Sequence, residues 1–267
     1  MRWETWAMAL LASVFASAVA MADDAAKKDL APGGKLRVGI AVAPTVGAGN
    51  VAREADGSYR GIAIDLGNEL GQKLGVPVEF VPYPNSGALT DAVDAGAWDV
   101  AFLPVDAQRK ARVDFGSAHI VLQSTYLVGA NSPIKTLADV DKAGVRVMGV
   151  EKTATARAAA ASLKATTIGH VKTADELFEL LKTDKADAIA LSRESLLALQ
   201  AKLPGSRVLD GAYLNSYVAV ALPKGKASGL AYATAFVDAA IGSGSVRRAL
   251  DKAGLATSQI PPPGTKP

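Results

Sequence analysis

Apolar residues recur at every fourth position in the stretch IAIDLGNELGQKL, residues 62–74. This spacing is typical of a helix with one buried face. Glycine follows at position 75, where it favours the left-handed backbone that ends many helices. The next residues, VPVEFVPYP, are mostly apolar and predict a buried strand. The buried face of the predicted helix comprises Ile62, Leu66, Leu70 and Leu74.

Similar strand and helix patterns alternate along the chain. KLRVGIAVA from Lys35 and WDVAFLPV from Trp98 predict strands, and SGALTDAVDAG from Ser86 predicts a helix. Further strands are expected to begin near residues 125, 145, 167, 186 and 216, and further helices near residues 136, 153, 173, 192, 227 and 246. Strands joined by helices in this way form parallel sheets. The pattern therefore predicts two α/β units of roughly a hundred residues each.

No linker rich in glycine and serine separates the two predicted units. The boundary, near residues 129–133, falls inside a strand-like run. Two units joined by strands near residues 125–130 and 215–221 predict a hinge with a cleft between them. Ligands of parallel sheets bind beyond the C-terminal ends of the strands, beside helix N-termini. The cleft is therefore the expected binding site.

The first residues, MRWETWAMALLASVFASAVAMADD, have the pattern of a secretory signal peptide. A cation at Arg2 precedes a short apolar run, and small residues allow cleavage after Ala20 or Ala22. We therefore expect a signal peptide at 1–22, an N-terminal extension at 23–34 and a periplasmic protein. The apolar run is short for a membrane span, which needs about 20 residues.

Composition narrows the chemistry further. The chain has no cysteine, so neither a disulfide nor a lipid on an N-terminal cysteine is expected. His119 and His170 are the only histidines, which makes a transition-metal site improbable. A net charge of +3 with scattered cations predicts no nucleic-acid partner. No cofactor and no metal are expected.

Motifs of common enzymes do not occur in the sequence. It contains neither the G-x-S-x-G nor the H-E-x-x-H pattern. SPIK at Ser132 and GAGN at Gly47 match short catalytic or nucleotide-binding patterns only in part, and we treat both as chance. No enzyme is therefore expected.

Five stretches carry a resemblance to a known family: KLRVGI, GSYRGIAIDLGNELGQKLG, DAVDAGAWDVAFLPVDAQRKARVDF, TLADVDKAGVRVMGV and YVAVALPKG. In this order and spacing they resemble the polar-amino-acid-binding family of periplasmic solute-binding proteins, the receptors of ABC importers. The resemblance implies a type II two-lobed α/β fold, with a mostly parallel sheet and flanking helices in each lobe and two crossing strands between the lobes. The implied bounds are 35–126 plus 219–256 for lobe 1, 127–218 for lobe 2 and 257–267 for a flexible tail.

The resemblance also implies two contacts with a ligand carboxylate. Arg109, six residues before Phe115, matches the arginine that clamps the α-carboxylate, and its planar fork suits that role. The alternative is a pair with a nearby aspartate. Thr153 matches the threonine that begins a helix of the second lobe, where free N–H groups favour an anion. It could equally be a helix cap without a ligand.

Several family positions differ here. The acid that holds a ligand ammonium corresponds to Ser192, followed by Arg193, and an aromatic partner of the ligand corresponds to Ile62. A buried ammonium without a partner is costly. The ligand is therefore expected to have a carboxylate, and either to lack an α-amino group or to hold it differently, for example through Glu151. Tyr83 ends a strand, and Asn85 and Ser86 lie where a helix begins. These residues either line the cleft or belong to ordinary structure.

The implied function is capture of a small polar solute with a carboxylate, such as an amino acid or a related organic acid. The expected partner is an ABC permease in the inner membrane, and a monomer is expected. Two alternatives stay open. One is a dehydratase-like enzyme that acts on a cyclic carboxylate, and the other is a solute sensor module.

Overall fold

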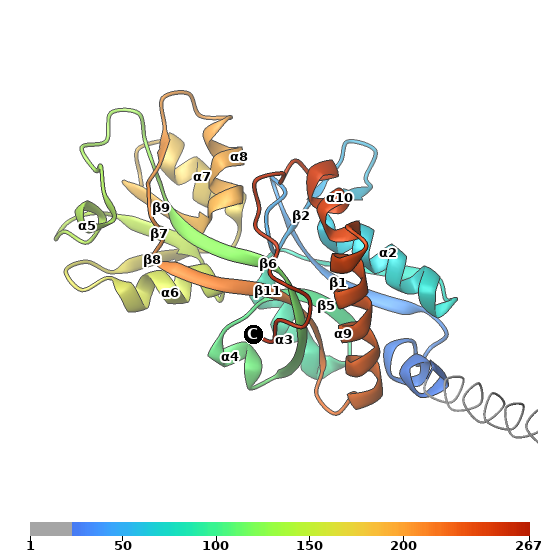
Figure 1. Ribbon diagram of the computed structural model, residues 1–267. Coiled ribbons are helices and arrows are strands. Elements are labelled where there is room, and N and C mark those ends of the chain that lie inside the picture. Colours follow the sequence, from blue (N-terminus) through green and yellow to red (C-terminus); the bar gives the residue numbers. More distant parts are fainter. Residues whose placement is uncertain (1–22) are drawn as a thin grey trace, which may run out of the picture.

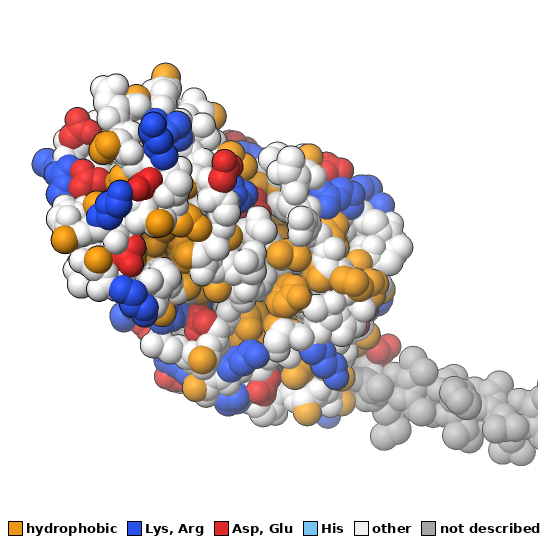
Figure 2. Space-filling model, turned by 60° about the vertical axis from the view of Figure 1, so that its left-hand side comes forward, with side chains coloured by type: hydrophobic (Ala, Val, Ile, Leu, Met, Phe, Trp, Pro, Cys, Tyr) orange, Lys and Arg blue, Asp and Glu red, His pale blue; other side chains and the backbone are white. Residues whose placement is uncertain are grey.

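The computed structural model describes residues 23–267, so the expected signal peptide lies outside the described residues. The chain folds into two lobes joined by a pair of long strands (Figure 1). Charged side chains lie mostly toward the rim of the face drawn in Figure 2, and hydrophobic side chains gather in its middle. None of the helices within residues 23–267 has the length and apolar character of a membrane span.

Lobe 1 contains both ends of the described chain. Its elements are β1 (Leu36–Ala43), β2 (Val51–Arg53), β3 (Tyr59–Arg60), α2 (Ile62–Leu74), β4 (Val78–Tyr83), α3 (Ser86–Asp91), the 3-10 helix η1 (Ala92–Ala95), β5 (Val100–Pro104), α4 (Ala107–Lys110), α9 (Ala227–Gly242) and α10 (Ser245–Lys252). The sheet is parallel where β1 pairs with β4 and β5. This is the predicted strand–helix–strand arrangement.

Lobe 2 also contains a parallel sheet with flanking helices. Its elements are α5 (Leu137–Val140), β7 (Val147–Val150), α6 (Ala154–Ser162), β8 (Ile168–Val171), α7 (Ala174–Lys182), β9 (Ala188–Ser192), α8 (Arg193–Gln200) and β10 (Arg207–Val208). β7 lies between β8 and β9 and is parallel to both.

Two crossing strands join the lobes. β6 (Val113–Val128) and β11 (Leu214–Pro223) pair antiparallel over most of their length. β11 contacts β5 of lobe 1, and β6 contacts β9 of lobe 2, so one continuous sheet runs through the molecule. The predicted type II two-lobed fold is confirmed. The expected boundaries between lobes fall inside these two strands.

Helix α2 forms as its periodicity predicts. The four residues of the expected apolar face are buried in lobe 1, and Gly75 caps the helix in the left-handed conformation, with φ of 64°. Ile62 belongs to this core, where it is 2% exposed. Its side chain packs inside lobe 1, because the helix periodicity turns position 62 inward.

The C-terminal residues, expected as a flexible tail, are bound along β6. The backbone N–H groups of Ala118 and Val121 donate to Thr265 and Gln259 at 2.9 and 2.8 Å. The backbone N–H of Gly264 donates to the Asp238 carboxylate at 2.7 Å. These contacts satisfy edge groups of β6 that would otherwise face solvent.

His119 on β6 is fully buried. Within residues 23–267 neither ring nitrogen has a hydrogen-bond partner, and the ring meets Phe102 edge-on at 5.2 Å between centroids. Burial in apolar surroundings lowers the pKa of His119 from 6.5 to about 3. Between about pH 3 and pH 6.5, the unfolded chain therefore binds a proton at this histidine, whereas the folded protein keeps His119 neutral.

This burial predicts acid sensitivity. Because the unfolded state binds the extra proton, stability falls as the pH drops below 6.5, by about 2 kcal/mol at about pH 5. His119→Leu should remove this contribution to the loss of stability at acid pH. Urea unfolding between pH 6.5 and about pH 5 measures it. His170→Leu, at an exposed ring, is the control and should retain the wild-type pH dependence. Equal pH dependence of all three proteins would contradict the prediction.

Candidate functional site

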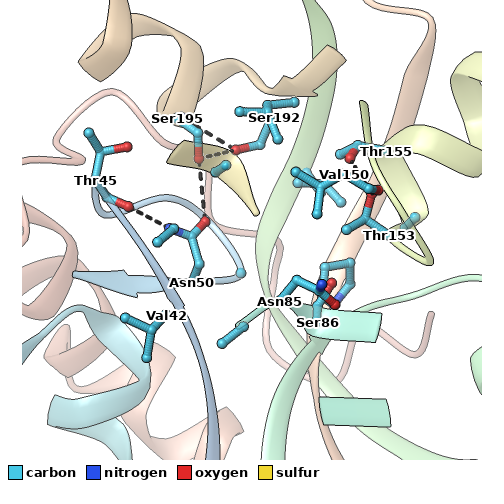
Figure 3. Close-up of a pocket in the computed structure, with 18 of the residues that line it drawn as sticks. Val42, Thr45, Asn50, Asn85, Ser86, Val150, Thr153, Thr155, Ser192 and Ser195 are labelled. Atoms are coloured by element: carbon cyan, nitrogen blue, oxygen red, sulfur yellow. Dashed lines mark hydrogen bonds between the residues drawn. The ribbon is translucent and has the colours of Figure 1, made fainter. Parts of the chain in front are cut away.

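A cavity of about 80 Å³ lies between the two lobes (Figure 3). It is bounded by the C-terminal ends of β1 and β9 and by the N-termini of α3, α6 and α8. Parallel strands place their C-terminal ends on one edge, and the following helices begin at the same edge. The cavity therefore occupies the position that the topology favours for a ligand.

Each lobe contributes four polar residues to the cavity wall. Lobe 1 supplies Thr45, Asn50, Asn85 and Ser86, and lobe 2 supplies Thr153, Thr155, Ser192 and Ser195. Three of the eight are helix caps. Asn85 accepts from two N–H groups of α3 at 2.8 Å, and Thr153 and Ser192 each accept from one N–H of their helices. Capping thus fixes these side chains at the cavity edge.

The rest of the wall is apolar. Val42, Leu122, Val150, Leu191 and Leu199 are among the side chains that cover it. None of the described lining residues is Lys, Arg, Asp, Glu or His. The cavity therefore offers hydroxyl and amide groups set in apolar surroundings, without a charged side chain in direct reach.

A chain of hydrogen bonds crosses from one lobe to the other beside the cavity (Figure 3). Ser192 Oγ donates to Ser195 Oγ at 3.0 Å, and Ser195 Oγ donates to Asn50 Oδ1 at 3.3 Å. The amide nitrogen of Asn50 donates to the Thr45 carbonyl at 2.5 Å. Polar lining residues of both lobes are thereby linked.

Ionic contacts close the opposite side of the cleft. Arg157 on α6 donates to the Asp106 carboxylate of lobe 1, and Lys152 Nζ lies 2.7 Å from the carboxylate of Asp91. The Asn85 amide of lobe 1 donates to the Lys172 carbonyl of lobe 2 at 2.8 Å. These contacts also join the two lobes.

Arg109 lies behind the cavity wall, not on it. Its side chain is 1% exposed and donates to Thr90 Oγ1 at 3.0 Å and to Ser86 Oγ at 2.9 Å. The other acceptors are the Pro104 carbonyl, the Asp106 carboxylate and the Lys152 carbonyl. Every N–H of the guanidinium thus has an acceptor in the protein. Burial lowers the pKa of Arg109 to about 10 although Asp106 opposes the shift, and the group stays charged at neutral pH.

The structure brings three of the expected site residues together, Ser86, Thr153 and Ser192. Tyr83 and Ile62 pack against apolar clusters of lobe 1 and are not among the lining residues. Arg193 turns away and donates to the carbonyls of Leu209 and Gly211.

Four polar lining residues were missing from the sequence expectations: Thr45, Asn50, Thr155 and Ser195. Two of them carry a usable signal, because Thr155 and Ser195 follow the helix caps Thr153 and Ser192 by two and three residues. Asn50 has none. It comes from the loop between β1 and β2, and only the folded lobe shows where that loop leads.

Residues 39–254 match the family described as bacterial extracellular solute-binding proteins, family 3. No curated protein sequence matches the chain.

Solved structures with the same architecture include the ancestral amino acid-binding protein AncCDT-1, a precursor of cyclohexadienyl dehydratase. It superposes with a TM-score of 0.73 at 26% identity, over 87% of this chain and 98% of that one. A mutant of ArgBP from T. maritima superposes with a TM-score of 0.75 at 21% identity, over 85% of this chain and 98% of that one. A solute receptor for L-cysteine of Neisseria gonorrhoeae superposes with a TM-score of 0.75 at 21% identity, over 86% of this chain and 92% of that one. At 21% identity the last two show the fold alone.

Proposed function

Because the chain belongs to family 3 of the bacterial extracellular solute-binding proteins, we propose that it captures a small polar solute with a carboxylate between its lobes. In this proposal the closed form delivers the solute to an ABC permease in the inner membrane. The protein acts as a monomer in the periplasm after its signal peptide is cleaved. The observation that carries the proposal is the cavity between the lobes, which polar groups of both lobes line.

The carboxylate has two sources of support in the cavity wall. Helices α6 and α8 begin there, and their N-terminal N–H groups and dipoles favour negative charge. On the other side, Ser86 accepts a hydrogen bond from Arg109, which leaves the serine proton free for a ligand oxygen. We therefore propose direct contacts from Ser86, Thr153 and Ser192, and an indirect role for Arg109 through Ser86.

We propose binding and not catalysis for the same site. A dehydratase needs a group that moves a proton near neutral pH. The described polar lining residues are hydroxyls and amides, which hold a ligand well but transfer protons poorly at that pH.

A screen followed by titration tests the proposal. A bound solute should raise the melting temperature in a library of amino acids, organic acids and amides. X-ray scattering should then show a larger fraction of the compact form with the solute. Absence of any stabilising solute, or identical scattering with and without a saturating one, would contradict the proposal.

The cavity wall predicts which variants weaken binding. Thr155→Val keeps the side-chain shape but removes a buried hydroxyl from the cavity. Affinity for the solute found in the screen should fall about tenfold by calorimetry, the value of one lost hydrogen bond. Thr125→Val is the control, because that buried hydroxyl donates to the Leu209 carbonyl away from the cavity. An equal loss in both variants would contradict the assignment of the site.

A further inference from the structure

Two aspartates near the cavity are paired with cations, and Glu194, buried in the first turn of α8, is not among the lining residues. Asp106 pairs with Arg109 and Arg157, and Asp91 pairs with Lys152. None of these carboxylates is among the lining residues. An ammonium group bound in the closed cavity would therefore lose water without gaining a counter-charge, which is strongly unfavourable.

A negatively charged group, by contrast, is favoured in this cavity. Helix α6 has nine residues and α8 has eight, and both begin at the cavity. A third source is independent of these helix ends: Ser86 is 8% exposed, faces the cavity and accepts from the fully buried guanidinium of Arg109. A hydroxyl that accepts from a cation is a stronger donor toward an anion. The wall is therefore electropositive without a lining cation.

The cavity has room for a small solute. A single water occupies about 10–15 Å³, so a cavity of about 80 Å³ accommodates several non-hydrogen atoms, enough for a small aliphatic acid.

We infer that the cavity selects small aliphatic monocarboxylates without an ammonium group, such as 2-hydroxy acids, over the amino acids of the same size. The inference rests on the proposed function, since it assigns the ligand class of that same cavity. A ligand hydroxyl in place of the ammonium is neutral, and it pairs with side chains such as Thr155 and Ser195 without a counter-ion.

L-Lactate, L-alanine and L-lactamide separate the contributions of charge. The three have the same number of non-hydrogen atoms, and each differs from L-lactate in a single group. Calorimetry on the intact mature protein should show L-lactate, its lower homologue glycolate or its deoxy analogue propionate binding at least about a hundredfold more tightly than L-alanine. Lactamide should bind at least about tenfold more weakly than L-lactate, because it lacks the negative charge.

A single substitution should reverse this preference. Ser192 is a helix cap and 7% exposed at the cavity, and aspartate caps a helix as well as serine. Ser192→Asp therefore adds a carboxylate with little local distortion. L-Lactate binding should fall at least about a hundredfold and L-alanine binding should rise at least about tenfold. Ser228→Asp, at an exposed position of the first turn of α9, is the control and should keep the wild-type order.

Several results would overturn the inference. In the wild-type protein, L-alanine or lactamide binding within about tenfold of L-lactate overturns the ligand class, while the proposed function of solute capture stands. Binding of none of these acids also overturns it, and the wider solute screen then judges the proposed function separately. In Ser192→Asp, an unchanged preference for L-lactate overturns the assigned role of the uncharged wall.

Discussion

Asp106→Asn is expected to lower the free energy of unfolding by about 3–5 kcal/mol. The substitution keeps the shape of the side chain and its capping of α4, since asparagine caps a helix as well as aspartate. It removes the negative charge beside Arg109, whose side chain is 1% exposed, and it places an NH2 donor where a carboxylate oxygen accepts from Arg109 and Arg157. A buried cation then remains without its counter-ion. Urea unfolding at neutral pH measures the loss.

Asp94→Asn is the matched control for this charge change. Asp94 also pairs with an arginine, Arg112, but its side chain is 72% exposed. Exposed ion pairs contribute about 0–1 kcal/mol, so this variant should unfold almost like the wild type. Equal stability of the two variants would contradict the view that Asp106 neutralises a buried charge.

The same substitution should also favour the open form. Asp106 accepts from Arg157 of the other lobe, so its neutralisation weakens a contact that exists only on closure. X-ray scattering of the unliganded Asp106→Asn protein should therefore show a larger radius of gyration than the wild type.

Secondary structure and fold could be predicted from the sequence because they depend on patterns that repeat. The four-residue period of α2 and the cap at Gly75 act locally, and neighbouring segments reinforce them. The strand-like boundary between the units likewise indicated the crossing strands β6 and β11. The course of residues 257–267 could not be predicted, because proline-rich segments find partners only on a folded surface such as β6.

The role of Arg109 shows where sequence reasoning about the site ends. Its position in the motif places a cation near the cleft but does not say which acceptors surround it. In the structure those acceptors come from three separate segments of the two lobes, including Thr90 and the Lys152 carbonyl. An arginine with every N–H occupied contributes to stability, whereas one waiting in an open cleft contributes little. Only the three-dimensional arrangement separates these two cases.

The two lobes approach each other closely at Gly87. A Cβ atom at this position would lie 2.3 Å from the Cβ of Lys152 and 2.9 Å from its carbonyl oxygen. Lys152 has a φ of 58°, an uncommon value for a residue with a side chain, so its backbone has little freedom to move aside. Within lobe 1, Gly87 belongs to α3, where alanine is a better helix former than glycine. The close contact therefore matters to closure far more than to folding.

Gly87→Ala is accordingly expected to block closure while the protein still folds. If the overlap costs the closed form about 3 kcal/mol, the apparent affinity for the captured solute falls about a hundredfold. The melting temperature without solute should stay near the wild-type value. Calorimetry and scattering with the solute present measure both effects, and the scattering profile should remain that of the open form.

Two further variants decide whether the overlap with Lys152 is the cause. Gly242→Ala makes the same substitution at a helical glycine with no heavy atom within 4 Å of the added Cβ, so affinity should not change. Lys152→Gly, added to Gly87→Ala, removes the opposing Cβ and gives position 152 the residue that tolerates positive φ. Because the Lys152 carbonyl remains, this double variant should recover affinity in part.

If Gly87→Ala binds the solute with wild-type affinity, the closed form tolerates a Cβ atom at this contact. A loss that Lys152→Gly leaves untouched would place the obstruction at the Lys152 carbonyl or the Asn85 side chain, which lie 2.9 and 3.0 Å from the added Cβ.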